Sequence, residues 1–331
     1  MTHDSPPAPE RPARADRVMV VPAGAAGTRL DRFLADRLRS HSRRQLMAIV
    51  REGVVLVDGR AARPGLVLRG GERVTVPTVG REASPRPEPA GGRVVTVIHR
   101  DDDLLVVSKP PGVPCHGGAG LGVRRTLLEL LKEDVLAGFG LAHRIDQDTS
   151  GLVALVRGAE LRARVSAAFA EDGVVEKEYD AIVERVPDPP TGTIDAPLAG
   201  PGHGTRARVD TKWGKPARTD YAVLESFGDS ARVRAVPVTG RTHQIRVHLA
   251  SIGTPLLVDP LYGRRSGWRL VDPKGGPAAR LQRTPLHAAR LTLPHPVTGV
   301  STTFHAPLFP DQRRALEVLR VTAARDREKA P

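Results

Sequence analysis

The sequence contains almost no cysteine. Cys115 is the only one in 331 residues, so no disulfide can form within the chain and no cluster of thiolates can bind a metal. A single cysteine in such a chain is expected to be a small buried hydrophobic residue. Small disulfide-stabilised folds and cysteine-based zinc sites are therefore excluded.

Aromatic residues are also scarce, and long apolar segments are missing. Phe, Trp and Tyr make up 3% of the chain, so the hydrophobic core is expected to be mainly aliphatic. No apolar run approaches the roughly 20 residues of a membrane-spanning helix. The N-terminal sequence MTHDSPPAPERPARADR is rich in proline and lacks the apolar segment of a secretory signal. We therefore expect a disordered tail over residues 1–20 and a cytoplasmic protein that does not bind membranes.

Residues 28–76 show the pattern of a small ααβββ module, which we place within residues 21–78. Apolar residues at helical spacing predict the first helix: Leu30, Phe33, Leu34 and Leu38. Ser42 can cap a second helix that ends before Gly53. The runs VVLV, LVL and VTV follow as short strands, separated by turns at Asp58-Gly59 and Gly70-Gly71.

Basic residues outnumber acidic residues, most of all in this module. The chain has 50 Lys and Arg against 37 Asp and Glu, a net charge of +13, and such basic proteins usually bind nucleic acid. Residues 28–76 hold eleven arginines, no lysine and five acidic residues, so this segment alone carries +6. Arg43 and Arg44 begin the second predicted helix, where free backbone N–H groups also attract phosphate, and we expect them to bind RNA.

A second domain is expected after a linker rich in proline and glycine, residues 79–93. From residue 94 to residue 322, strand-like runs outnumber helical patterns, and we expect a short tail over residues 323–331. The expected strands include LLVVSKP, GLVALVR, KEYDAIV, DYAVLE, ARVRAVPV and ARLTL. The expected helices span 126–135, 159–170, 242–251 and a stretch from 311 onward. This pattern predicts an α+β domain with a large mixed, mostly antiparallel sheet and flanking helices.

The stretch HRIDQDTSG, residues 143–151, places charged and turn-forming residues between two apolar runs. Three interpretations compete: a structural turn, a loop that holds Asp146 as a catalytic carboxylate, and a metal site built on His143 and Asp146. No second cluster of His, Asp or Glu with ligand spacing accompanies the pair, so the metal site has the least support. The residues alone favour the turn and leave the catalytic loop open.

A second polar segment, TGRTHQIRVHLASIG, also precedes an apolar run. Thr242 can cap a helix that ends at Ser251, before Gly253. On that helix His243 and Arg246 are three residues apart and share a face. An arginine in this position can pair with a carboxylate across a site.

These segments, in their order, resemble motifs of the RluA-type pseudouridine synthases. The matching segments are DDDLLVVSKPPGVPCHGG (101–118), HRIDQDTSGLVAL (143–155), KEYDAIV (177–183), TGRTHQIRVHLASIGTPLLVDPLYG (239–263) and LHAARLTLPHPVTG (286–299) with FHAPLF after it. Residues 28–76 are similar to the S4 RNA-binding module that many of these enzymes carry. The resemblance covers nearly all the chain apart from the tails and linker.

The resemblance implies a role for individual residues. It makes Asp146 the catalytic carboxylate, Tyr179 the ring that stacks on the target uracil, and Arg246 the basic partner of Asp146. Arg144 is expected to enter the RNA stack when the target base leaves it. Further RNA contacts are expected from Arg241, His243 and Lys109. The sequence departs from the family pattern at Ile145, Val258 and Pro260, so we expect Asp259 and Tyr262 to be structural or to shape the substrate site.

The implied activity is isomerisation of uridine to pseudouridine in structured RNA, with large-subunit ribosomal RNA as the expected substrate. The reaction breaks the C1′–N1 bond and rejoins the uracil through C5 without oxidation, so no cofactor, metal or nucleotide is expected. A transfer-RNA substrate is one alternative, and a non-catalytic RNA-binding factor in ribosome assembly is another. We expect a monomer whose partner is RNA.

Overall fold

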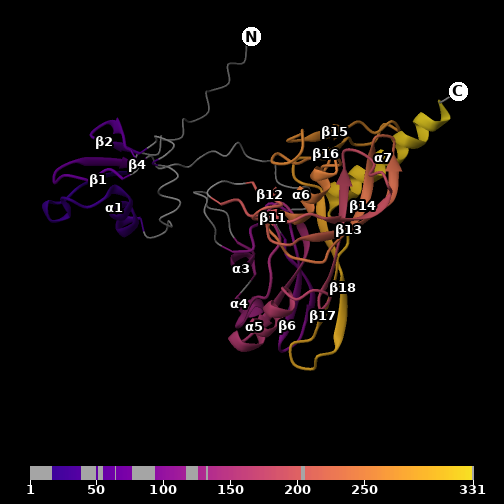
Figure 1. Cartoon of the computed structure of the whole chain (residues 1–331), viewed down its shortest axis with the longest axis horizontal. Coiled ribbons are helices and arrows are strands. Elements are labelled where there is room, and N and C mark those ends of the chain that lie inside the picture. Colours follow the sequence, from indigo (N-terminus) through magenta and orange to yellow (C-terminus); the bar gives the residue numbers. More distant parts are fainter. Residues whose placement is uncertain are drawn as a thin grey trace, which may run out of the picture. The chain divides into compact units, whose positions relative to one another are not determined.

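The computed structural model describes residues 17–38, 50, 55–63, 65–76, 94–116, 126–131, 133–202 and 206–329 (Figure 1). These residues divide into two separately packed units, one within residues 17–76 and one within residues 94–329. Across the described ranges, no helix is long and apolar enough to cross a membrane. Each unit is described here by itself.

The first unit is a four-stranded antiparallel sheet with a helix packed on it. The strands follow the order β1-β4-β2-β3 and are β1 (Arg17–Val20), β2 (Leu56–Val57), β3 (Arg60–Ala61) and β4 (Arg73–Val76). Helix α1 (Leu30–Arg37) buries Leu30, Phe33 and Leu34 against the sheet's aliphatic core, as its helical spacing predicts. Asp58 and Gly59 both have positive φ, 48° and 76°, as a two-residue hairpin turn between β2 and β3 requires.

Some expectations for this unit are wrong, and others concern residues that the structure does not describe. The tail expected over residues 1–20 ends too late, because Arg17–Val20 form β1 and pair with β4. The LVL run is not a strand, since Val67 makes only an isolated bridge with Arg29. Most of the predicted second helix, with Ser42, Arg43 and Arg44, lies outside the described residues, as does the expected linker.

The second unit is built on a mixed ten-stranded sheet (Figure 1). Its main path runs β10-β13-β14-β9-β17-β8-β6-β5, while β18 pairs with β17 and β7 pairs with β8. Every pairing is antiparallel except β17 with β8, as expected for a mostly antiparallel sheet. The strands are β5 (Thr96–Arg100), β6 (Leu104–Lys109), β7 (Phe139–Leu141), β8 (Ser150–Arg157), β9 (Glu176–Val183), β10 (Thr191–Asp195), β13 (Arg218–Phe227), β14 (Ser230–Pro237), β17 (Leu286–Pro294) and β18 (Ser301–His305).

In the described part of this unit, two small two-stranded sheets and five helices accompany the large sheet. The small sheets pair β11 (Leu198–Ala199) with β12 (Arg208–Val209), and β15 (Trp268–Leu270) with β16 (Ala279–Leu281). The helices are α3 (Leu127–Leu130), α4 (Glu133–Leu136), α5 (Ala159–Ala168), α6 (Gln244–Ser251) and α7 (Pro310–Glu328). Strands β6 and β8 are almost wholly buried, which explains their uninterrupted apolar sequence.

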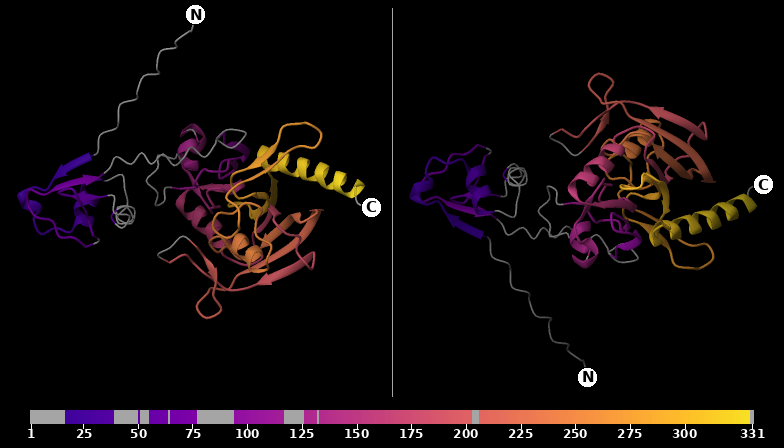
Figure 2. Two further views of the ribbon diagram at one scale, coloured as in Figure 1. Left: turned by 90° about the horizontal axis from the view of Figure 1, so that it is seen from above. Right: turned by 90° about the horizontal axis from the view of Figure 1, so that it is seen from below.

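The structure corrects three helix expectations. The helix expected over 126–135 is divided, because Leu131 has an extended ψ of 130° that separates α3 from α4. Thr242 does not cap α6; His243 is the N-cap, with a left-handed φ of 58°. The tail expected over 323–331 is wrong to residue 328, since α7 continues through Glu328, and Figure 2 shows this yellow helix extending from the sheet toward the C-terminus.

Candidate active site

Asp146 lies on the loop that joins β7 to β8, beside the middle of the large sheet. The backbone N–H of Thr149 donates to the carbonyl of Asp146 at 3.2 Å, so the loop is closed by a turn. The next strand begins at Ser150 and includes Gly151, which passes so close to β17 that a Cβ atom would lie 2.3 Å from the carbonyl oxygen of Ala288. The turn and the tight strand packing together fix where the carboxylate of Asp146 points.

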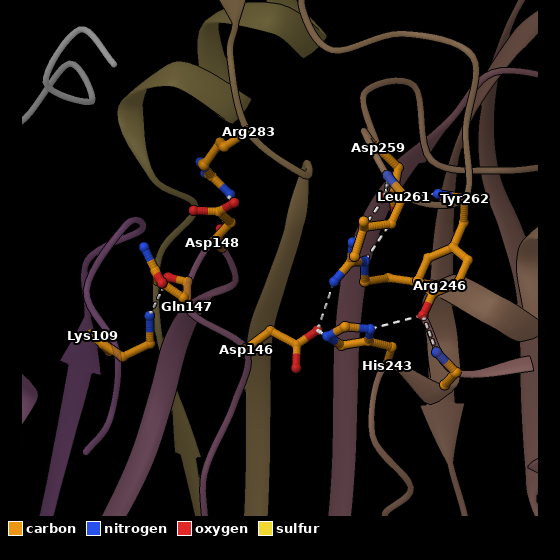
Figure 3. A network of polar contacts seen from close by, with 11 residues as sticks. Lys109, Asp146, Gln147, Asp148, His243, Arg246, Asp259, Leu261, Tyr262 and Arg283 are labelled. Atoms are coloured by element: carbon orange, nitrogen blue, oxygen red, sulfur yellow. Dashed lines mark hydrogen bonds and ion pairs between the residues drawn. The ribbon is translucent and has the colours of Figure 1, made fainter. Parts of the chain in front are cut away.

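Arg246 of α6 faces this carboxylate. Its Nη1 donates to Oδ2 of Asp146 at 3.2 Å, across 100 residues of sequence (Figure 3). Its Nε and Nη2 donate to the two carboxylate oxygens of Asp259, each at 2.8 Å. Burial lowers the pKa of Arg246, but Asp259 and Asp146 outweigh burial and leave that pKa above its ordinary value. The guanidinium is thus a permanent positive charge that two carboxylates share.

His243 is the second group that faces Asp146, with Nε2 at 3.9 Å from Oδ2 (Figure 3). Its Nδ1 lies 2.8 Å from the hydroxyl oxygen of Tyr262, which also accepts the backbone N–H of Ala207 at 2.8 Å. The Tyr262 ring packs edge-on against His243 and lies under the guanidinium of Arg246. Burial lowers the pKa of His243, although the charge of Asp146 acts in the opposite direction, so the imidazole is neutral at pH 7.

A cavity of about 320 Å³ opens at Asp146, a volume within the range of small-molecule sites. Tyr179 of β9 and Phe169 contribute aromatic rings to its wall, together with Lys177. Burial raises the pKa of Tyr179, and the nearby charge of Asp146 raises it further, so the phenol is protonated. The cavity therefore combines one carboxylate, paired cations and flat apolar surface.

Two other arginines from the predicted set are at the surface beside this cavity. Arg144 is exposed and its Nη1 lies 3.4 Å from Nε2 of His116. Arg241 is exposed as well, and its Nε donates to the carbonyl of Pro216 at 3.0 Å. Both line the opening that Asp146 faces. The structure thus brings Asp146, Tyr179, Arg246, Arg144, Arg241 and His243 together around one cavity.

The structure argues against the expectation that Lys109 contacts RNA. Its side chain is fully buried, and its ammonium donates to the carbonyls of Pro110, Val113 and Gln147 at 2.8 to 3.0 Å. Burial lowers the pKa of Lys109 to about 8. Because Gln147 follows Asp146, this lysine joins the loop after β6 to the loop that carries the carboxylate.

His143 and Cys115 serve packing. Nε2 of His143 accepts the backbone N–H of Ala154 at 3.0 Å, and the ring stacks on Phe169 with centroids 4.0 Å apart. That nitrogen is occupied, which argues against the metal interpretation of His143 with Asp146. Among the described residues, no group of three or more His, Cys, Asp or Glu is arranged to hold a metal. Cys115 is buried, as expected.

Comparisons with known proteins agree with this geometry. A family model described as RNA pseudouridylate synthase matches residues 103–251, and an S4 domain model matches residues 28–74. Ribosomal large subunit pseudouridine synthase D of Nitrosomonas europaea is 36% identical over 309 residues, which cover 91% of this chain and 87% of that protein. The chain belongs to the RNA pseudouridylate synthase family.

Other proteins of this family are also similar to this pseudouridylate synthase. Ribosomal large subunit pseudouridine synthase C of Escherichia coli (strain K12) is 34% identical over 92% of this chain and 97% of that protein. A solved structure of human RNA Pseudouridylate Synthase Domain Containing 4 has a TM-score of 0.53 at 25% identity, covering 68% of this chain and 93% of that one. Both resemblances that the sequence motifs suggest are confirmed.

Sequence reasoning about this pseudouridylate synthase undervalued two residues of the site. Asp259 was expected only to be structural or to shape the substrate site, yet it holds the guanidinium that reaches Asp146. Lys177 lines the cavity, and burial lowers its pKa. Both lie inside motifs, but one sequence does not reveal which motif residues face one another. Lys177 could have been noticed as a cation two residues before Tyr179 on one strand, since such residues share a face.

Proposed function

We propose that this enzyme isomerises uridines of large-subunit ribosomal RNA to pseudouridine, with Asp146 as the catalytic carboxylate. The observation that carries the proposal is the pairing of Asp146 with Arg246 at 3.2 Å inside a cavity lined by Tyr179. Two of the most similar relatives are named ribosomal large subunit pseudouridine synthases, which supports ribosomal RNA as the substrate.

The reaction breaks the C1′–N1 bond, turns the uracil and forms a C1′–C5 bond, while the C5 proton leaves and N1 gains one. Asp146 supplies the negative charge beside the reacting nucleotide, and the buried guanidinium of Arg246 compensates that charge. The flat ring of Tyr179 offers a stacking surface for the uracil.

The target uridine has to leave the RNA stack before it can reach this cavity. Extrusion of a base costs a few kcal/mol, which stacking and hydrogen bonds in the pocket offset. We assign the exposed guanidinium of Arg144, at the rim of the cavity, to the position that the base vacates, and Arg241 and His243 to the extruded nucleotide. The substrate is thus held on both sides of the flipped base.

The N-terminal S4 module would supply affinity for folded RNA. Its arginine-rich sequence suits phosphate binding, and we assign phosphate contacts to Arg43 and Arg44. Replacing both by alanine should weaken RNA binding and reduce its dependence on salt, because each lost phosphate contact lowers the slope of log K against log salt by about 0.7 to 0.9. We also infer that the protein is a cytoplasmic monomer. Light scattering after gel filtration tests the monomeric state.

The decisive experiment compares wild type, Asp146→Asn and Asp102→Asn on a transcript of bacterial large-subunit ribosomal RNA in EDTA. Asp102 is an exposed aspartate at the bend between β5 and β6, so its variant controls for the loss of one carboxylate. Carbodiimide treatment and primer extension should map new pseudouridines for wild type and Asp102→Asn alone. Activity in Asp146→Asn would overturn its role, and modification of a transfer-RNA transcript alone would overturn the proposed substrate.

A further inference from the structure

Trp213 stands out by its exposure. Every other Phe, Tyr and Trp of the chain is buried or half-buried, whereas the Trp213 side chain is 77% exposed. An indole of this size in water forgoes the stabilisation that burial would give it. The described residues therefore leave most of this indole uncovered.

The turn that carries Trp213 is rigidly held. One carboxylate oxygen of Asp210 accepts the backbone N–H groups of Lys212 at 3.2 Å and Trp213 at 2.9 Å, while the carbonyl of Asp210 accepts the N–H of Gly214 at 2.8 Å. A Cβ atom at Gly214 would lie 2.3 Å from that same carbonyl oxygen, so the turn closes tightly. Leu198 and Lys215 then exchange two backbone hydrogen bonds of 2.9 Å. The exposed indole is thus presented by a fixed backbone.

Both arms of this turn are tied to the cavity wall. On one arm, the N–H of Ala207 donates to the Tyr262 hydroxyl that holds His243. On the other arm, the carbonyl of Pro216 accepts Nε of Arg241. His243 and Arg241 both line the cavity, and Figure 1 shows β11 and β12 next to α6. The turn is therefore part of the protein surface next to the cavity.

The charge around Trp213 suits RNA. Asp210 is the sole acidic residue of segment 206–218, and it is paired with Arg208 at 2.9 Å. The basic side chains of the segment are all exposed: Arg206, Arg208, Lys212, Lys215 and Arg218. The Lys212 ammonium lies 5.4 Å from the indole centroid, which leaves the rest of the ring surface for a ligand. Flat aromatic surface among cations is what unpaired nucleotides bind, through base stacking and phosphate contacts.

We propose that the Trp213 turn, residues 206–218, binds an unpaired nucleotide of the RNA near the target uridine by stacking its base on the indole. The site rests on the proposed function in one respect, namely that the RNA is the substrate. It adds a requirement beyond the flipped base: a substrate segment with at least one unpaired nucleotide beside the target.

Tryptophan fluorescence tests the stacking directly on the full-length protein. A single-stranded 12-nucleotide uridine oligomer should quench the wild-type emission, and a perfect RNA duplex of equal length should quench it less. Trp213→Phe retains Trp268 as its one tryptophan and should lose the quenching. Equal quenching of the wild type and this variant would overturn the proposal. The proposal would also be overturned if the wild type showed no quenching at RNA concentrations that a filter assay shows to be saturating, as expected if the indole binds a protein partner instead.

Kinetics on the ribosomal transcript separate binding from chemistry. Trp213→Ala should raise KM about 5- to 150-fold, the range of one lost base–aromatic stack, with kcat within twofold of wild type. Trp213→Phe should recover most of the loss, and Val300→Ala, which shortens another exposed apolar side chain, between β17 and β18, should leave KM unchanged. An unchanged KM in Trp213→Ala overturns the stacking site. If the wild type binds the transcript but does not isomerise its uridines, the proposed function is overturned instead. The fluorescence quenching then still tests whether the Trp213 turn binds RNA.

Discussion

Asp259 holds the guanidinium of Arg246 in the one orientation that leaves Nη1 free to reach Asp146. Two hydrogen bonds of 2.8 Å fix Nε and Nη2, and the third contact, to Asp146, measures 3.2 Å. Asp259 is fully buried and also accepts the backbone N–H groups of Leu261 and Tyr262 at 2.9 and 3.1 Å. One buried carboxylate therefore positions both the cation and the tyrosine beneath the site (Figure 3).

Asp259→Asn should lower kcat at least about tenfold with little change in KM. The amide keeps an acceptor for one guanidinium nitrogen but loses the charge that orients the other, so Arg246 samples other positions and Asp146 is less well held. Unfolding by urea should show a loss of about 3 kcal/mol, because a buried cation loses half of its compensation. Single-turnover pseudouridine formation measures the first effect.

Asp311→Asn is the matched control for Asp259→Asn. Asp311 binds Arg283 through the same two-bond geometry at 2.8 Å, and that pair is similarly buried. Arg283 reaches the same loop only at the carbonyl of Asp148, at 3.5 Å from Nη1, and not at the carboxylate of Asp146, so this variant should lose similar stability with a much smaller loss of kcat. Equal losses of kcat in the two variants would show that Asp259 acts only through stability.

Lys109→Met should loosen the loop that carries Asp146 without changing RNA affinity. The thioether matches the length of the lysine stem but leaves the carbonyls of Pro110, Val113 and Gln147 without their donor. We expect about 2 to 4 kcal/mol less stability and a lower kcat, because several buried acceptors become unsatisfied. Filter binding at several salt concentrations is the discriminating measurement: a shallower salt dependence would mean that Lys109 contacts phosphate after all.

Lys109 also shows where sequence reasoning about this fold reaches its limit. The apolar runs predict β6, β8, β9, β14 and β17, because buried strands need uninterrupted or alternating apolar residues. From the sequence, a lysine at the end of such a run is expected to be exposed. The three groups that accept its hydrogen bonds are backbone carbonyls, which no pattern of side chains reveals. Strand β1 could not be predicted either, because its partner β4 follows more than 50 residues later.

The candidate site could also be predicted only in part from the sequence. The pairing of Asp146 with Arg246 could be predicted from the motifs, and the structure brings the two together. The local rule that chose Thr242 as the cap of α6 fails because the site holds His243 in a left-handed conformation, which costs a non-glycine residue on the order of 1 kcal/mol or more. Contacts with Tyr262 and Asp146 offset that cost, and both arise only in the folded chain.

Gly151→Ala should destabilise the second unit by about 3 kcal/mol or more. Gly151 has a φ of 108°, and an added Cβ would lie 2.3 Å from the backbone of Ala288, so β8 and β17 would have to separate. Gly173→Ala is the control, because its φ of 81° is also unfavourable for alanine but no atom lies within 4 Å of the added Cβ. That variant should cost about 1 kcal/mol in urea unfolding. Similar costs at the two positions would mean that backbone conformation alone requires glycine at 151.

His143 should make the protein less stable as the pH falls. Burial lowers its pKa to about 3 in the folded chain, from 6.5 when exposed. Between pH 6.5 and 5 the unfolded chain therefore takes up a proton that the folded chain does not, and stability falls by about 1.4 kcal/mol per pH unit, or about 2 kcal/mol in all. His143→Gln retains an acceptor for the N–H of Ala154 but does not titrate, so it should lack this loss. Urea unfolding of both proteins at pH 7 and pH 5 measures the difference, in which the other histidines cancel. Parallel changes in the two proteins would show that His143 is protonated in the folded state.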